Sequence, residues 1–187
     1  MVNNQPLLES KFEALPRARI NQIINSLPYP YDVLFAIQYL TASRITETLM
    51  LRQKDFSIQQ LDGRDLLVIL MKVLKRRNKA VYRTVPIRLD ELFTDKIISC
   101  VNNLNHNNES LLFPNISKNL AWYHLTKNYP EIRTHTFRRS RITELYKDFD
   151  WRDSDIVKFI SWASSAPMST YVGLKWRDTA KLILNNS

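Results

Sequence analysis

Apolar residues recur at helical spacing over most of the first fifty positions. They come three or four positions apart in three consecutive runs, residues 18–27, 31–40 and 44–52. Apolar positions at this spacing line one side of a helix. Pro28 and Pro30 interrupt the pattern between the first two runs, so the sequence predicts separate helices.

The period of the pattern changes after Asp55. Short stretches rich in Leu, Val and Ile cover residues 56–61, 65–74 and 80–87, and Asp62-Gly63 marks a turn between the first two. Stretches of this length separated by turns are typical of β-strands that pair in sequence order. The pattern predicts a three-stranded antiparallel sheet in the middle of the chain.

Helical spacing returns after the predicted strands. Asp90, Ser117, Thr134 and Asp153 each precede an apolar run and can cap the free N–H groups at the start of a helix. The pattern as a whole predicts a single α+β domain, mainly α, with helices around a small three-stranded antiparallel sheet. The predicted helices end at Leu104, Tyr129, about Lys147 and Ala163, and an amphipathic C-terminal helix follows over residues 176–187.

The amino-acid composition favours some kinds of partner and excludes some kinds of site. Lys and Arg number 27 against 18 Asp and Glu, and the resulting net charge of +9 favours an anionic polymer or surface as partner. The single cysteine, Cys100, excludes an intramolecular disulfide and a multi-cysteine metal site, and two glycines exclude glycine-rich nucleotide loops. The sequence has neither a long apolar run nor a secretion signal, so we expect a cytoplasmic protein with no membrane partner.

Positive charges gather where the second and third strands are predicted to join. The chain has no acidic residue from Leu66 to Leu89. A basic hairpin of this kind can follow a DNA backbone and release counterions from its phosphates, whereas a merely solvated turn is the alternative interpretation. The candidate DNA contacts are Lys72, Lys75, Arg76, Arg77, Lys79 and Arg83.

A second basic segment lies on the helix predicted from residue 135. His135 and Arg138 project from one face of this helix, three residues apart, and can bind the same anion. Taken alone, the pair also fits a solvated basic helix. Arg139 and Arg141, on the same helix, are further candidate DNA contacts.

Taken in order, four segments resemble the motifs of the tyrosine recombinase or phage integrase family, which includes the Cre, Xer and lambda integrase types. TASRITE at residues 41–47 is similar to the box that supplies an arginine and an acidic partner. The hairpin ending at Ile87 resembles the one that delivers a lysine. HTFR at residues 135–138 is similar to the His-x-x-Arg box, and FISW at residues 159–162, with Tyr171 nine positions later, resembles the closing box.

Two positions depart from the family pattern. Ala42 stands where the first box usually has glycine, and Ile160-Ser161-Trp162 replaces the usual Leu-Gly-His triplet. These departures leave the subfamily open but keep every expected catalytic residue type. The resemblance implies a DNA breaking–rejoining fold for residues 1–187, with a core at about 10–175, and the N-terminal core-binding domain of the family is expected to be absent.

The chemistry of phosphodiester transfer assigns roles to these residues. Extra negative charge develops on the phosphate oxygens, and Arg44 and Arg138 are chosen to stabilise it because guanidinium groups stay protonated and donate paired hydrogen bonds. Tyr171 is the expected nucleophile, and His135 is the candidate base or hydrogen-bond partner.

Three further residues complete the expected catalytic set. The resemblance implies that a hairpin lysine protonates the leaving 5′ oxygen, and Lys75 is favoured over Lys72 and Lys79. Glu47 is expected to orient Arg44 or the histidine, with an ordinary exposed acid as the alternative. Trp162 is expected to pack against the phosphate pocket, with a core aromatic as its alternative.

The resemblance therefore implies a site-specific DNA recombinase or integrase, of the kind carried by mobile genetic elements, that needs no cofactor, metal or ATP and forms a 3′-phosphotyrosine intermediate. Its expected partner is double-stranded DNA of the nucleoid or host cell, on which the chain would form a dimer or tetramer; no small-molecule substrate is expected.

Other functions remain open from the sequence. A type IB topoisomerase uses closely similar tyrosine chemistry, and a catalytically silent DNA-binding module would keep the fold alone. A metal-dependent nuclease would need acidic ligands such as Asp148, Asp150, Asp153 and Asp155, although these also fit the start of a helix, where negative charge is favourable. A test of DNA cleavage in EDTA, which removes divalent metal ions, distinguishes the metal-dependent nuclease from the tyrosine mechanism.

Overall fold

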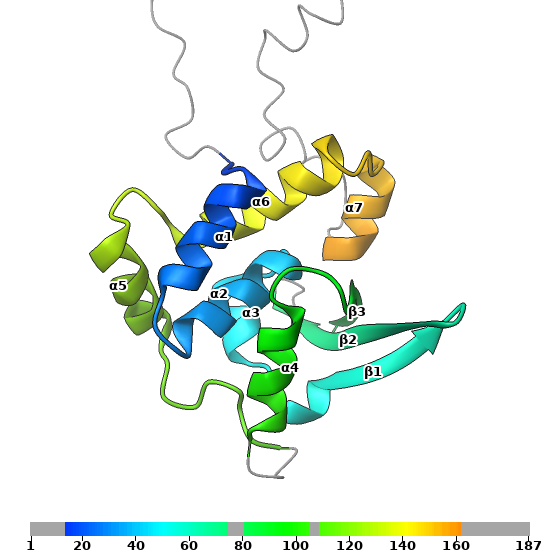
Figure 1. Cartoon of the computed structure of the whole chain (residues 1–187), viewed down its shortest axis with the longest axis horizontal. Coiled ribbons are helices and arrows are strands. Elements are labelled where there is room, and N and C mark those ends of the chain that lie inside the picture. The colour runs from blue at the N-terminus through cyan, green and yellow to red at the C-terminus, as the bar shows by residue number, and fades with distance from the viewer. Residues whose placement is uncertain (1–13, 75–80, 105–108, 162–187) are drawn as a thin grey trace, which may run out of the picture.

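The computed structural model describes residues 14–74, 81–104 and 109–161. Seven helices, one 3-10 turn and three strands make up this part of the chain (Figure 1). Their order is α1 (Arg17–Ser26), α2 (Tyr31–Leu40), α3 (Ile45–Leu49), η1 (Gln53–Asp55), β1 (Phe56–Leu61), β2 (Arg64–Val73), β3 (Val81–Arg88), α4 (Thr94–Asn102), α5 (Lys118–Asn128), α6 (Thr134–Lys147) and α7 (Asp153–Ile160).

Helix α2 forms the centre of the main core. Nine of its ten residues are buried, and it packs against α1, α3, α4 and α6. Phe35 of α2 stacks on Phe137 of α6 with the ring centroids 4.8 Å apart. A helix that is apolar on almost every side must be covered on every side, so α2 fixes the positions of the elements around it.

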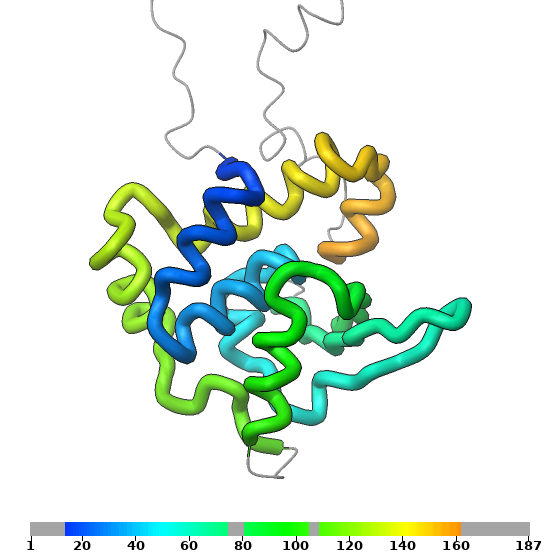
Figure 2. The backbone as a smooth tube through the Cα atoms, in the orientation of Figure 1, coloured from blue at the N-terminus to red at the C-terminus, as the bar shows by residue number. Residues whose placement is uncertain are grey.

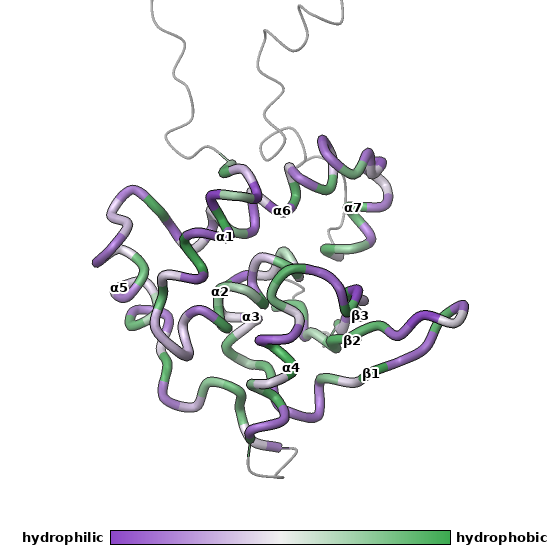
Figure 3. The backbone as a smooth tube through the Cα atoms, viewed as in Figure 1, coloured by the Kyte–Doolittle hydropathy of each residue, from purple (hydrophilic) through white to green (hydrophobic). Residues whose placement is uncertain are grey.

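The three strands form one antiparallel sheet in the order β1-β2-β3. In β3 every second residue is buried, whereas β1 is largely exposed along its length. The β1–β2 hairpin extends away from the helices in Figure 1, and Figure 3 colours its outer part hydrophilic. Only one face and one end of the sheet therefore contribute to the core.

A second, smaller apolar cluster joins α6 and α7 to the turn that follows α2. Its buried members are Ala42, Ile142, Leu145, Ile156 and Ile160. Helix α7 also contacts β3, and Figure 2 shows the two close together. This cluster places the end of α7 beside the chain segment that leads into α3.

The α+β fold class and the three-stranded antiparallel sheet predicted from the sequence are confirmed. The predicted cap at Ser117 is also confirmed, since its Oγ accepts a hydrogen bond from the N–H of Leu120 at 3.1 Å. The predicted C-terminal helix at 176–187 lies outside the described residues.

Several predicted helix boundaries are wrong. Asp90 does not cap α4, because its carboxylate binds the exposed Arg88 at 2.8 Å and the helix begins four residues later, after Phe93 in a left-handed conformation. Thr134 and Asp153 are the first residues of their helices and not the caps. The helix expected over residues 44–52 covers only Ile45–Leu49.

Candidate active site

The candidate site begins at the sharp turn between α2 and α3. Ala42, at the centre of this turn, has φ +48°, in the left-handed region that favours glycine. This conformation costs a non-glycine residue about 1–2 kcal/mol. The glycine that the family motif usually has at this position is thus explained by the backbone, and Ala42 offsets the strain by burying its methyl group in the second cluster.

Glu47 lies at the centre of the site and is almost completely buried. Its Oε2 accepts the backbone N–H of Arg44 at 2.8 Å, and its Oε1 accepts a bond from Arg44 Nη1 at 2.6 Å. Burial alone would raise the pKa of Glu47, but the hydrogen bonds and charge of Arg44, with the charge of Arg138, lower it. Glu47 is therefore an anion at neutral pH and orients Arg44.

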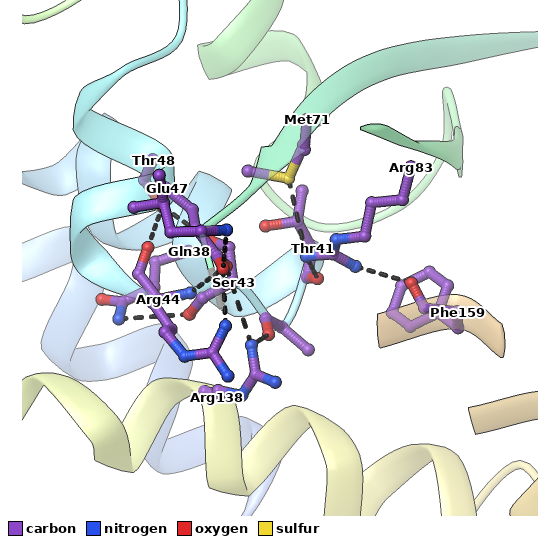
Figure 4. A network of polar contacts seen from close by, with 12 residues as sticks. Gln38, Thr41, Ser43, Arg44, Glu47, Thr48, Met71, Arg83, Arg138 and Phe159 are labelled. Atoms are coloured by element: carbon purple, nitrogen blue, oxygen red, sulfur yellow. Dashed lines mark hydrogen bonds and ion pairs between the residues drawn. The ribbon is translucent and has the colours of Figure 1, made fainter. Parts of the chain in front are cut away.

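Arg138 comes to the same carboxylate from α6. Only 1% of its surface is exposed, and its Nη1 lies 3.9 Å from Glu47 Oε2. The same nitrogen donates a hydrogen bond to the carbonyl of Ala42 at 2.6 Å. Figure 4 shows the guanidinium groups of Arg44 and Arg138 side by side, although 94 residues separate them in the sequence.

His135 lies one turn before Arg138, at the start of α6, and its side chain is exposed. Its pKa is nevertheless lowered, first by the atoms that partly desolvate the imidazole and then by the positive charges of Arg138 and Arg44. The neutral imidazole is therefore favoured near pH 7, which is the form that can accept a proton.

The end of β2 also reaches the site. The backbone N–H of Leu74 points to Glu47 Oε1 at 3.5 Å. Lys75 follows in the sequence, but it lies outside the described residues, as do Arg76, Arg77, Lys79, Trp162 and Tyr171. Of the other predicted residues, Lys72 is exposed on β2 and Arg139 is partly exposed on α6.

Two of the predicted DNA contacts do not face solvent, because their side chains point into the protein. Arg83 is 6% exposed and donates to two backbone carbonyls. Arg141 is 8% exposed and binds Glu144 at 2.5 Å. The inner positions of β3 alternate as Arg83, Val85 and Ile87, so the period of two already indicated a buried arginine.

The sequence pattern predicted Arg83 as a surface DNA contact and did not identify it as part of the interior of the site. Its guanidinium is flanked by the turn before α3 and the end of α7 (Figure 4). Burial, together with the positive charges of Arg138 and Arg44 and against the opposing effect of Glu47, lowers its pKa to about 10. The three arginines and Glu47 thus share one electrostatic environment.

The arrangement suits an anion with several oxygens. Two guanidinium groups, those of Arg44 and Arg138, lie against a single carboxylate, and Arg83 adds a third positive charge nearby, which leaves an excess of positive charge in a largely buried environment. Such groups interact with a phosphate more strongly than they would in water, because few water molecules screen them. Arg44, whose side chain is 21% exposed, is the member open to a ligand.

The acidic residues considered for a metal do not form a site. Within the described residues, which include Asp148, Asp150, Asp153 and Asp155, no group of three or more His, Cys, Asp or Glu residues could hold a metal ion. Asp155 instead binds Arg152 at 3.0 Å. In the same ranges of the chain, no helix is both long and apolar enough to cross a membrane.

Comparison with solved structures identifies the fold. The chain is similar to XerH site-specific recombinase bound to palindromic difH substrate in a post-cleavage complex, with a TM-score of 0.64, 18% identity, and coverage of 91% of this chain and 52% of that one. The pre-cleavage XerH complex with difH gives a TM-score of 0.61 at 19% identity, covering 89% of this chain and 52% of that one. The chain thus spans about half the length of the XerH chain.

The Tn1549 transposon integrase in complex with transposon right end DNA gives a TM-score of 0.63 at 14% identity, covering 100% of this chain and 68% of that one. The fold is therefore that of a tyrosine recombinase catalytic domain. Comparisons with protein-family models and with curated proteins found no match.

Proposed function

We propose that this chain is the catalytic domain of a site-specific DNA recombinase or integrase that cuts and rejoins DNA through a 3′-phosphotyrosine intermediate. One observation carries the proposal: Arg44 and Arg138 converge on Glu47 within the fold of a recombinase. The convergence supports phosphate binding because a surface basic patch needs no buried carboxylate to orient its arginines.

In the proposed reaction Tyr171 Oη attacks the phosphorus of one DNA strand, and the bond to the 5′ oxygen breaks. The phenol proton passes to His135, whose lowered pKa favours the neutral form that can take it. Lys75 gives a proton to the leaving 5′ oxygen. Its place next to Leu74, whose N–H faces Glu47, supports this assignment.

Arg44 and Arg138 stabilise the negative charge that develops on the two non-bridging oxygens. Trp162 packs against the same pocket and limits water, which would otherwise hydrolyse the phosphotyrosine bond. Rejoining reverses the first step, with a 5′ hydroxyl as nucleophile and Tyr171 as leaving group. The energy of the broken bond is retained, so neither ATP nor a metal is required.

The proposed partner is double-stranded DNA, with Lys72, Arg76, Arg77, Lys79 and Arg139 as phosphate contacts. Strand exchange needs two DNA sites and therefore at least two subunits, so we propose self-association on DNA and action on nucleoid or host-cell DNA in the cytoplasm. The topoisomerase-like alternative would instead relax a supercoiled plasmid that carries no specific site.

The deciding experiment uses a nicked duplex from which the cleaved end diffuses away, so that a covalent adduct accumulates. The wild-type chain should form an adduct on a denaturing gel in the presence of EDTA, whereas Tyr171→Phe should not. Tyr123→Phe, which alters an exposed tyrosine of α5, is the matched control and should behave as wild type. An adduct that persists in Tyr171→Phe would place the nucleophile elsewhere.

A further inference from the structure

Arg83 joins three elements that are far apart in the sequence. From the inner face of β3, its Nη2 donates to the carbonyl of Thr41 at 2.7 Å and its Nη1 donates to the carbonyl of Phe159 at 2.7 Å. Nη2 also lies 3.6 Å from the sulfur of Met71 in β2. One planar side chain therefore connects the turn before α3, the sheet and the last turn of α7 (Figure 4).

Both ends of this bridge lead to candidate catalytic residues. Thr41 is three residues before Arg44, and Phe159 is three residues before Trp162 and twelve before Tyr171. The Arg83 guanidinium also lies 5.7 Å from the centroid of the Phe159 ring, so it contacts both the backbone and the side chain of that residue. Arg83 thus connects the turn before Arg44 to the end of α7.

The chemistry of the bridge requires arginine. Its two terminal nitrogens sit in a fixed fork and can donate in two directions at once, whereas a lysine ammonium is one point on a flexible stem. No carboxylate in the described parts of the chain forms an ion pair with Arg83. Burying such a charge is costly, and an apolar residue of similar volume would suit stability as well.

We propose that Arg83 is a positioning residue, which holds the end of α7 at a fixed distance from the Arg44 turn and so sets where the segment carrying the nucleophile leaves the domain. The inference rests on the proposed function, because positioning matters only if Tyr171 must reach the arginine pair. Arg83 is not a catalytic residue, since both of its bonds are to backbone carbonyls.

The test compares Arg83→Lys and Arg83→Met with Arg88→Lys, a control in the same strand at an exposed arginine bound to Asp90. Single-turnover adduct formation should fall on the order of 10- to 100-fold in both Arg83 variants, as expected for a misplaced reacting group. DNA affinity should not change, because Arg44 and Arg138 remain. The control should match wild type in both measurements.

Hydrogen exchange of the α7 amides in the DNA-free protein gives a second, independent readout. Exchange should rise in Arg83→Lys and Arg83→Met while α2 stays protected, which also shows that the variants fold. A wild-type rate of adduct formation in Arg83→Lys alone would mean that only the charge of Arg83 matters and would overturn the proposal. Equal losses of adduct-formation rate and DNA affinity in the Arg83 variants would overturn it too.

The two proposals can fail separately. A wild-type chain that forms no adduct would reject the recombinase reaction, and the exchange of α7 would then decide whether Arg83 anchors that helix. Unchanged α7 exchange in both Arg83 variants would reject the anchor, whatever the wild-type chain does to DNA.

Discussion

Helix α6 carries two buried arginines three residues apart, and they belong to networks of opposite character. Arg138 and Arg44 share a single carboxylate, Glu47, and the charge of Arg83 lies nearby without an ion pair of its own among the described residues. Arg141 joins a second network in which every arginine has a carboxylate partner. The same residue type on one helix thus contributes to a site with excess positive charge and to a neutral structural network.

The neutral network ties α1 and the β3–α4 connection to α6. Glu144 accepts bonds from Arg17 at 2.8 Å, from Arg141 at 2.5 Å and from the hydroxyl of Tyr39 at 2.7 Å. Glu91 also binds Arg17 and lies 3.9 Å from Arg141. The positive charges of two arginines equal the negative charges of two carboxylates, so this network has no net charge left to attract a ligand.

The comparison gives a physical criterion for the function of a buried arginine. Charge that is balanced inside the protein stabilises the fold, whereas charge in excess stabilises the fold less and attracts an anion. Changes in the neutral network of Arg17, Arg141, Glu91 and Glu144 should therefore alter stability, and changes in the network around Glu47 should alter DNA cleavage.

The largest effect is expected for Arg138→Ala. Removing one donor to the developing phosphate charge should reduce the single-turnover rate of adduct formation on the order of 10²–10³-fold. Arg17→Lys, in the neutral network, is the matched control and should retain the wild-type rate in folded protein. A comparable loss of rate in the control would remove the distinction between the two networks.

Glu144→Gln should mainly destabilise the protein. The substitution removes the charge that pairs Arg17 and Arg141, and it should lower the free energy of unfolding by about 1.5–3 kcal/mol. Urea unfolding measures this change, and the adduct rate of the folded fraction should stay as in wild type. A large loss of rate with unchanged stability would contradict the assignment.

Acid should weaken the neutral network. Burial would raise the pKa of Glu144, but the charge of Arg141 and the hydrogen bonds from Arg17 and Tyr39 lower it. A carboxyl with a lowered pKa contributes stability that is complete above its ordinary pKa and is lost as pH falls through the lowered value. Below about pH 4.5 the free energy of unfolding, measured with urea, should therefore fall more steeply with decreasing pH for wild type than for Glu144→Gln.

His135 should titrate below the ordinary histidine pKa of 6.5. The unfolded chain then takes up the proton first, so the contribution of His135 to stability falls as pH drops from 6.5 to the lowered pKa. NMR titration of the imidazole in DNA-free protein measures the value. Arg44→Gln removes one nearby positive charge and should raise this pKa, and a wild-type pKa at or above 6.5 would contradict the expected environment.

The smallest effect is expected at the surface. Lys54 and Glu109 are exposed and form an ion pair at 2.6 Å, which water screens on all sides. Lys54→Ala should leave both the urea midpoint and the adduct rate unchanged. A clear loss of stability would show that short distance, and not burial, decides which ion pairs stabilise this protein.

Local patterns in the sequence determined much of the fold and part of the candidate site. The change of period after Asp55 located the strands, and the spacing of Arg44 to Glu47 and of His135 to Arg138 identified pairs at the starts of two helices. Such features depend on neighbours a few residues apart, which is why the sequence alone could reveal them.

The tertiary structure decided the partners of the buried arginines. Arg83, Arg138 and Arg141 are all basic residues in basic segments, yet one binds backbone carbonyls, one faces Glu47 and one binds Glu144. These partners of Arg83 and Arg138 lie 42 to 91 residues away and are brought to them only by tertiary packing, and the packing around α6 also decides that Arg141 is buried against Glu144 on its own helix. A buried charge is governed by what surrounds it in space, so its role cannot be determined from residue type or local spacing.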